Sequence, residues 1–136
     1  MATDDVQRLK SKVIKYCGKC RNPALPLFEI SRLYDLQTEW KSTEFPYSDD
    51  HGCYVFYSET YKLLYIGKAS LKHALGARIA GYFRWNIERE TLVADGEWKP
   101  SPPRFLQTVK VNEAFEAPSL EEYLLRELDP PANSRK

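Results

Sequence analysis

The chain of 136 residues is long enough for one domain with a modest core, and its 43% hydrophobic and 13% aromatic content excludes a disordered chain. Its formal net charge of +1 gives no overall sign of nucleic-acid binding, and the absence of any run of about 18 apolar residues excludes a membrane-spanning helix. The first residues resemble no signal peptide, so we expect a protein of the cytoplasm, or of the nucleus if the source is eukaryotic.

Two helices are predicted in the first 50 residues. Residues 4–17 and residues 28–40 both place hydrophobic side chains at helical spacing. The segment 41–51 is polar and contains Pro46, which is typical of a connector. We therefore expect residues 1–50 to form a helical extension of unknown role, which could dock DNA, bind a protein partner or form a homodimer.

Three cysteines, an odd number, do not form the disulfide framework of a secreted domain. Cys17 and Cys20 have the spacing of half a zinc site, but only His51, Cys53 and His73 could complete it. Two reduced thiols near a helix end are the stronger interpretation, and a structural zinc site is the weaker one.

An antiparallel hairpin is predicted next. Residues 53–57 are a continuous run of strand-forming side chains, as expected for a strand covered on both faces, and residues 63–66 form a second run. Only the short, mostly polar segment 58–62 separates them, which favours a hairpin.

The remaining elements complete a domain of residues 51–136. Residues 75–87 show a helical stripe, residues 91–103 read as a proline-rich loop, residues 105–111 as a strand and residues 118–128 as a helix. This order predicts an α+β fold in which a small antiparallel three-stranded sheet is flanked by helices.

Charge is unevenly distributed along the chain. Residues 62–89 carry six basic side chains against Glu88 alone, and residues 113–129 carry six acidic side chains against Arg126 alone. The basic segment could hold phosphates and the acidic one a cation, but two solvated helix faces explain the pattern equally well.

The last predicted helix contains a carboxylate in an unusual place. Ser119 and Glu122 fit a capping box, which gives Glu122 a structural task. Glu121 falls inside the leucine stripe of the same helix and is expected to turn toward its buried side. A buried carboxylate needs a cation, so Glu121 is a candidate metal ligand, although a glutamate at a helix end can also bend into solvent.

Several short motifs now combine in a fixed order. They are Gly52-Cys53-Tyr54, Leu64-Tyr65-Ile66-Gly67-Lys68-Ala69, Arg78-Ile79-Ala80-Gly81-Tyr82-Phe83, then Glu121, Leu124-Leu125, Pro130 and Asn133. Over residues 52–133 this set resembles the GIY-YIG nuclease superfamily, and is most similar to the N-terminal nuclease module of the bacterial excision-repair protein UvrC. Cys53 stands where the family usually has isoleucine, and the turn between Gly67 and Arg78 is longer than usual.

The resemblance implies a metal-dependent endonuclease that hydrolyses DNA phosphodiester bonds. Tyr54 would be the general base, with its pKa lowered by Lys68, Arg78 or the metal. Arg78 would clamp the scissile phosphate, and Glu121 would bind one Mg²⁺ or Mn²⁺.

Other residues would support this chemistry. Tyr65 and Tyr82 would hydrogen-bond the water or the phosphate, with Tyr82 sharing a helix edge with Arg78. Asn133 would fix the local backbone or orient a site group. Contacts to DNA are expected from Lys68, Lys72, His73 and Arg84. The alternative is a catalytically silent nucleic-acid-binding or assembly module of the same fold.

Overall fold

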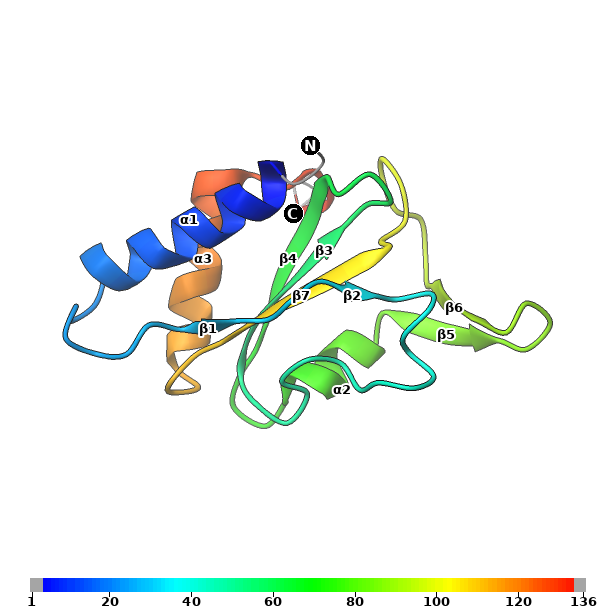
Figure 1. Ribbon diagram of the computed structural model, residues 1–136, viewed down its shortest axis with the longest axis horizontal. Helices are drawn as coiled ribbons and strands as arrows, with labels where there is room; N and C mark the ends of the chain where they lie inside the picture. Colours follow the sequence, from blue (N-terminus) through cyan, green and yellow to red (C-terminus); the bar gives the residue numbers. More distant parts are fainter. Residues whose placement is uncertain (1–3, 134–136) are drawn as a thin grey trace.

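The computed structural model describes residues 4–133, which form an α+β fold around an antiparallel sheet. Figure 1 shows two helices along one side of the sheet, α1 (Asp4–Lys19) and α3 (Glu116–Leu128), and the short α2 (Leu75–Ala80) on the other side. A hairpin of β5 (Phe83–Asn86) and β6 (Thr91–Ala94) projects from the body. A short 3₁₀ turn, η1 (Pro131–Asn133), follows α3.

The predicted central hairpin is confirmed. Strand β3 (Gly52–Tyr57) pairs antiparallel with β4 (Leu63–Ala69) on one side and with β7 (Phe105–Lys110) on the other. All six residues of β3 are buried, as a strand covered on both faces requires. This central position explains the run of hydrophobic side chains without polar alternation.

Side chains of β3 alternate between two separate cores. Cys53, Val55 and Tyr57 pack with α1 and α3, whereas Tyr54 and Phe56 pack with α2 on the opposite face. The two tyrosine-bearing motifs of the sequence therefore contribute to the α2 face, away from the two long helices.

The predicted helix over residues 28–40 is wrong. This segment contains two short strands, β1 (Glu29–Ile30) and β2 (Tyr34–Asp35), which both pair with the outer edge of β7. Both oxygens of the Asp35 carboxylate accept hydrogen bonds from Arg104, at 2.8 and 2.9 Å, and this contact lowers the pKa of Asp35 to about 2. Pairing with a distant strand has overridden the local helical pattern.

Residues 4–50 therefore share the sheet and core of the later residues. The sheet has five strands, more than the three expected, in the order β1-β7-β3-β4, with β2 also on β7. Helix α1 packs on α3, and the buried side chains Leu9 and Val13 belong to the same core as Val55. Only α1 of the two predicted N-terminal helices is confirmed.

The predicted helix over residues 75–87 is correct only in its first half. Helix α2 ends at Ala80, with Gly81 at its C-cap, and the chain continues as strand β5. Strand β6 pairs with β5 and takes up the start of the predicted loop 91–103. Aromatic and β-branched side chains, which favour extended backbone, are concentrated in this hairpin.

The predicted capping box of the last helix is also wrong. Helix α3 begins at Glu116, with Phe115 at the N-cap, so Ser119 lies inside the helix. The Ser119 hydroxyl is instead 2.6 Å from the hydroxyl of Tyr16 on α1. The carboxylate of Glu116 accepts the backbone N–H of Glu113 at 3.0 Å, which ties down the start of the helix.

Within residues 4–133, no helix combines the length and the apolar character needed to cross a bilayer.

Candidate active site

Three tyrosine hydroxyls form a hydrogen-bonded row on the α2 face of the sheet. The hydroxyl of Tyr82 lies 2.8 Å from that of Tyr54 and donates to that of Tyr65 at 3.0 Å. Tyr54 comes from β3, Tyr65 from β4, and Tyr82 from the segment just after α2. The structure thus brings together the three tyrosines singled out in the sequence.

Sheet register explains why two of these rings meet. Tyr54 is paired with Gly67, and Phe56 with Tyr65, so all these positions share one face. A Cβ atom on Gly67 would overlap the ring of Tyr54, and 2.6 Å would separate it from the ring carbon Cε1. Because Gly67 has no side chain, the ring of Tyr54 can pack directly against the backbone of β4.

Replacing Gly67 by alanine is expected to lower the free energy of unfolding by roughly 1–3 kcal/mol, because the new methyl group displaces the Tyr54 ring. Urea denaturation measures this change. The control is Gly18→Ala in α1, where an added Cβ meets nothing within 4 Å. This variant should raise the free energy of unfolding slightly, by less than about 1 kcal/mol, because alanine favours a helix more than glycine does. Equal stabilities of Gly67→Ala and the parent chain would contradict the packing described.

Arg78 stands beside the tyrosine row, in the last turn of α2. Burial raises the pKa of Tyr54, while the hydrogen bond to Tyr82 and the charge of Arg78 act in the opposite direction. The net direction is upward, because the lowering by Arg78, which was expected, is smaller than the rise caused by burial. Burial also raises the pKa values of Tyr65 and Tyr82, which keeps all three phenols protonated at neutral pH.

The predicted i, i+4 pairing of Tyr82 with Arg78 on one helix is wrong, because Tyr82 lies beyond the end of α2. It follows the C-cap Gly81, and its backbone N–H bonds the carbonyl of Ile79 at 3.1 Å. Burial raises the pKa of Tyr82, and the charge of Arg78 partly offsets that rise, so the two side chains lie near each other at the turn.

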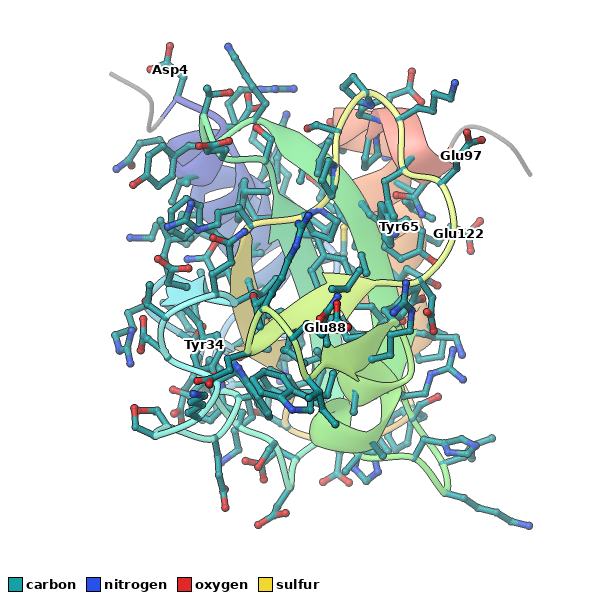
Figure 2. All side chains as sticks on the ribbon, turned by 90° about the vertical axis from the view of Figure 1, so that its right-hand side faces the viewer. Asp4, Tyr34, Tyr65, Glu88, Glu97 and Glu122 are labelled. Atoms are coloured by element: carbon teal, nitrogen blue, oxygen red, sulfur yellow. The ribbon has the colours of Figure 1, made fainter. Side chains whose placement is uncertain are left out.

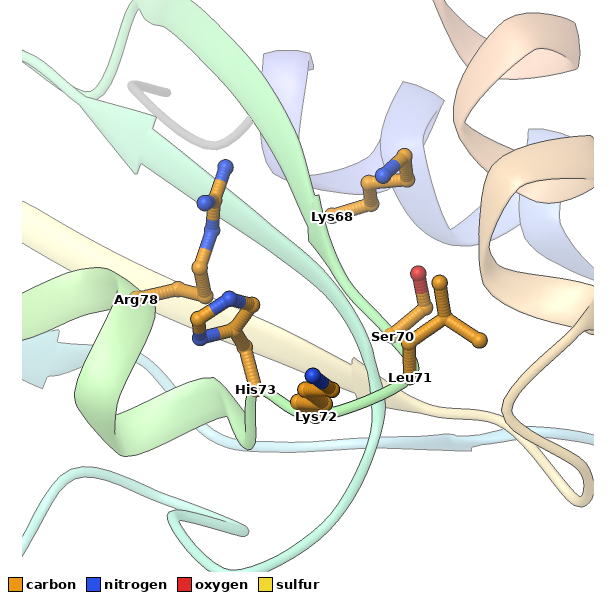
Figure 3. A pocket seen from close by; sticks show the side chains of 6 residues that line it. All are labelled: Lys68, Ser70, Leu71, Lys72, His73 and Arg78. Atoms are coloured by element: carbon orange, nitrogen blue, oxygen red, sulfur yellow. The ribbon is translucent and has the colours of Figure 1, made fainter.

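Arg78 also lines a basic pocket of about 360 Å³, shown in Figure 3. Arg78 rises from α2 next to His73, and Lys68 extends from β4 on the other side of the opening. Among residues 4–133, no ion pair involves any cationic side chain of this pocket. The lining residues are Lys68, Ser70, Leu71, Lys72, His73 and Arg78.

The lengthened turn after Gly67 forms the floor of the basic pocket. Leu71 has a left-handed backbone, with φ of 60°, and its carbonyl lies 3.1 Å from the Nε2 of His51. The N–H of His73 bonds the carbonyl of Ser70 at 3.2 Å. These contacts give the extra residues a defined shape, so they present Lys72 and His73 beside Arg78.

Glu121 is half-buried on α3, not fully buried as the leucine stripe predicts. Its charge contributes to the raised pKa values of Cys53 and of Tyr65, after burial, and Lys68 partly offsets its effect on Cys53. Glu121 therefore lies near the β4 edge, within electrostatic range of both the tyrosine row and Lys68.

One half-exposed carboxylate suits a hard cation that keeps most of its water ligands, as Mg²⁺ does. Residues 4–133 contain no cluster of three or more His, Cys, Asp or Glu side chains arranged to enclose a metal. A metal held by Glu121 would thus take its remaining ligands from water and from a substrate phosphate. Cys17 is buried in the core and Cys20 is exposed.

Asn133 completes the open edge of β4. Its side-chain carbonyl accepts the backbone N–H of Ile66 at 2.9 Å, and its amide donates to the carbonyl of Ile66 at 3.0 Å. The side chain satisfies the two groups that a further strand would bond. This is the backbone-fixing contact expected of Asn133, one residue from Tyr65.

Trp98 belongs to the site and was not predicted from the sequence. Its ring centroid lies 5.7 Å from that of Tyr65 and 6.0 Å from that of Tyr82. The residue sits in a segment predicted to be loop, and a lone tryptophan among prolines was the only available signal. Arg84, by contrast, is exposed on β5 and paired with Asp95 at 3.0 Å, away from the basic pocket.

Comparison with known proteins neither supports nor opposes the resemblance noted in the sequence. No protein-family model matches the chain, and no curated protein matches it either.

Proposed function

We propose that the chain is a metal-dependent endonuclease of the GIY-YIG type, acting on DNA phosphodiester bonds. The observation that carries the proposal is the hydroxyl of Tyr82, which bonds both Tyr54 and Tyr65 beside the guanidinium of Arg78. Three phenols and an arginine from three segments, β3, β4 and α2 with its following turn, converge on one place. Such a group can hold a water molecule and a phosphate oxygen at once.

In this proposal Arg78 binds the scissile phosphate, and Lys68, Lys72 and His73 bind the flanking backbone in the basic pocket. A water molecule held by the tyrosine row attacks phosphorus, and its proton passes to the Tyr54 phenolate. The bond to the 3′-oxygen breaks and that oxygen takes a proton from bulk water, which leaves a 3′-hydroxyl and a 5′-phosphate. Tyr65 and Tyr82 position the water, and their hydroxyls are held in place by the hydrogen bonds of the row.

Glu121 would hold the divalent ion, Mg²⁺ or Mn²⁺. When bound, the ion supplies positive charge for the leaving oxygen. The position of Glu121 near Tyr65 supports this role, because the carboxylate and the tyrosine row can then face the same phosphate.

Cleavage is expected to accelerate with pH if Tyr54 is the base. Because burial raises its pKa above 10, the phenolate fraction rises about tenfold per pH unit between pH 7 and pH 9. The measurement is the single-turnover cleavage rate across this range. Tyr54→Phe should be slow and lack this slope, whereas Tyr16→Phe, remote on α1, should keep it; a slope retained by Tyr54→Phe would rule out Tyr54 as the base.

The proposal is tested by incubating the purified chain with supercoiled, branched and single-stranded DNA, in Mg²⁺, in Mn²⁺ and in EDTA. We expect cleavage of at least one substrate with either metal and none in EDTA. Cleavage that survives EDTA would refute the metal-dependent mechanism.

The second candidate, a silent nucleic-acid-binding module, is favoured by one observation. All three phenols have raised pKa values, which makes a poor base of Tyr54 unless a bound metal or substrate offsets burial. Binding of DNA without cleavage of any of the substrates would select this candidate.

A further inference from the structure

A second cavity, here called the aromatic pocket, is lined by two tyrosines of the row. It has a volume of about 400 Å³. Rings of Tyr65, Tyr82 and Trp98 form its walls, and the β6–β7 loop supplies charged side chains. The full lining is Tyr65, Tyr82, Asp95, Glu97, Trp98, Lys99, Pro131 and Ala132.

Trp98 is held in place as a wall of this pocket. Its indole N–H donates to the carbonyl of Asp95 at 3.1 Å, and its ring meets that of Tyr65 at 82° and that of Phe56 at 85°. The residue is only half-buried, so part of the indole remains open to the pocket. A planar ligand would stack on one ring and meet the others edge-on.

The rim of the pocket offers hydrogen-bond acceptors. Glu97 is exposed, and no hydrogen bond or ion pair joins it to another residue within 4–133. Lys99 adds a donor. Carboxylate oxygens accept from exocyclic amino groups, which adenine, cytosine and guanine carry and thymine lacks.

The two pockets are neighbours. Tyr65 and Tyr82 line the aromatic pocket, and Tyr82 follows Arg78, which lines the basic pocket, by four residues across the turn that ends α2. In Figure 2, Tyr65 lies beneath the β6–β7 loop and Glu97 stands on its outer side. A nucleotide whose phosphate contacts Arg78 therefore has an aromatic cavity within reach of its base.

We propose that the aromatic pocket binds one unpaired, amino-bearing nucleobase next to the phosphate bound at Arg78. This inference rests on the proposed function and narrows its substrate to DNA with an unpaired or extruded nucleotide at the cleavage site. A base inside a duplex cannot enter such a pocket without leaving the stack.

The test measures DNA binding alone, by fluorescence anisotropy in EDTA. The probes are labelled single strands of equal length: oligo-dC, oligo-dA, oligo-dT and a strand of abasic residues with the same phosphates. We expect oligo-dC and oligo-dA to bind about tenfold more tightly than the abasic strand, with oligo-dT between them. Equal binding of the base-bearing and abasic strands would overturn the proposal.

Two variants locate the effect. Trp98→Ala should weaken oligo-dC binding until it is close to that of the abasic strand. Trp85→Ala, on the hairpin outside the pocket, should change the affinity for neither strand. Glu97→Gln alters an exposed side chain and leaves the core intact, and it should reduce the preference for oligo-dC over oligo-dT. An unchanged preference in Glu97→Gln, or full oligo-dC binding by a folded Trp98→Ala, would overturn the proposal.

Failure of the base-binding proposal can be distinguished from failure of the nuclease proposal, because binding and cleavage are measured separately. Base-dependent binding that Trp98→Ala removes supports the aromatic pocket even if no DNA is cut. Cleavage by a chain that binds abasic and base-bearing strands equally overturns the pocket and leaves the nuclease.

Discussion

Replacing Arg78 by alanine is expected to slow DNA cleavage about a thousandfold, because charge that develops on the phosphate loses its guanidinium partner. Arg78 is exposed at the end of α2 and, among the described residues, is outside every ion pair, so its removal leaves no buried group unpaired. Folding should be little affected, and the loss should appear in the cleavage rate. Single-turnover nicking at saturating protein concentration measures it.

The matched control is Arg84→Ala, which removes an arginine that is also exposed and only six residues away. Arg84 is paired with Asp95 on the hairpin and does not line the basic pocket. Its loss should change cleavage by less than about threefold, because Arg84 lies outside the basic pocket that binds the phosphate. Equal losses in the two variants would mean that Arg78 acts only through general charge.

Replacing Glu121 by glutamine is expected to reduce cleavage by roughly two to three orders of magnitude at fixed Mg²⁺, because the ion loses its one carboxylate ligand. The amide keeps the size of the side chain and its place near Tyr65. Cleavage rates measured over a Mg²⁺ or Mn²⁺ titration separate weaker metal binding from a lost catalytic group. Weaker binding shifts the midpoint of the titration to higher metal concentration.

Glu122→Gln provides the comparison on the same helix. Glu122 is exposed and lines a different cavity with Tyr16 and Arg126, so its metal titration should match that of the parent chain. A shifted midpoint in Glu122→Gln and none in Glu121→Gln would place the metal elsewhere.

Much of the site was predictable because neighbours in sequence become neighbours in a hairpin. The short segment 58–62 favours an antiparallel hairpin, and in the register that forms, Tyr54 lies opposite Gly67. Helix α3 was predictable from its leucine spacing, which also placed Glu121 on the side that faces the β4 edge.

The segments that were predicted wrongly depend on contacts far along the chain. Tyr34 becomes a strand residue because it pairs with Leu106, and nothing local distinguishes it from a residue of an amphipathic helix. Phe83 pairs with Ala94 across the β5–β6 hairpin, which removes it from the helical stripe that starts at Leu75. Competition between a local period and distant pairing is decided only in the folded chain.

Trp98 and Ser119 illustrate the same limit at the level of single side chains. Trp98 reaches the tyrosine row from a proline-rich loop whose path has no sequence signature. Ser119 matched the N-cap of a capping box, but the helix begins three residues earlier, at Glu116, and the Ser119 hydroxyl bonds Tyr16 instead. Local motifs specify what a residue can do, and tertiary packing selects among those options.

The most direct test of the central claim is the nicking of supercoiled plasmid by the purified chain, followed by treatment with DNA ligase. The proposed mechanism predicts nicks that form in Mg²⁺ but not in EDTA, that are lost with Arg78→Ala, and that ligase reseals because each carries a 3′-hydroxyl and a 5′-phosphate. Nicks that form equally in EDTA, or that Arg78→Ala produces at the parent rate, would contradict it.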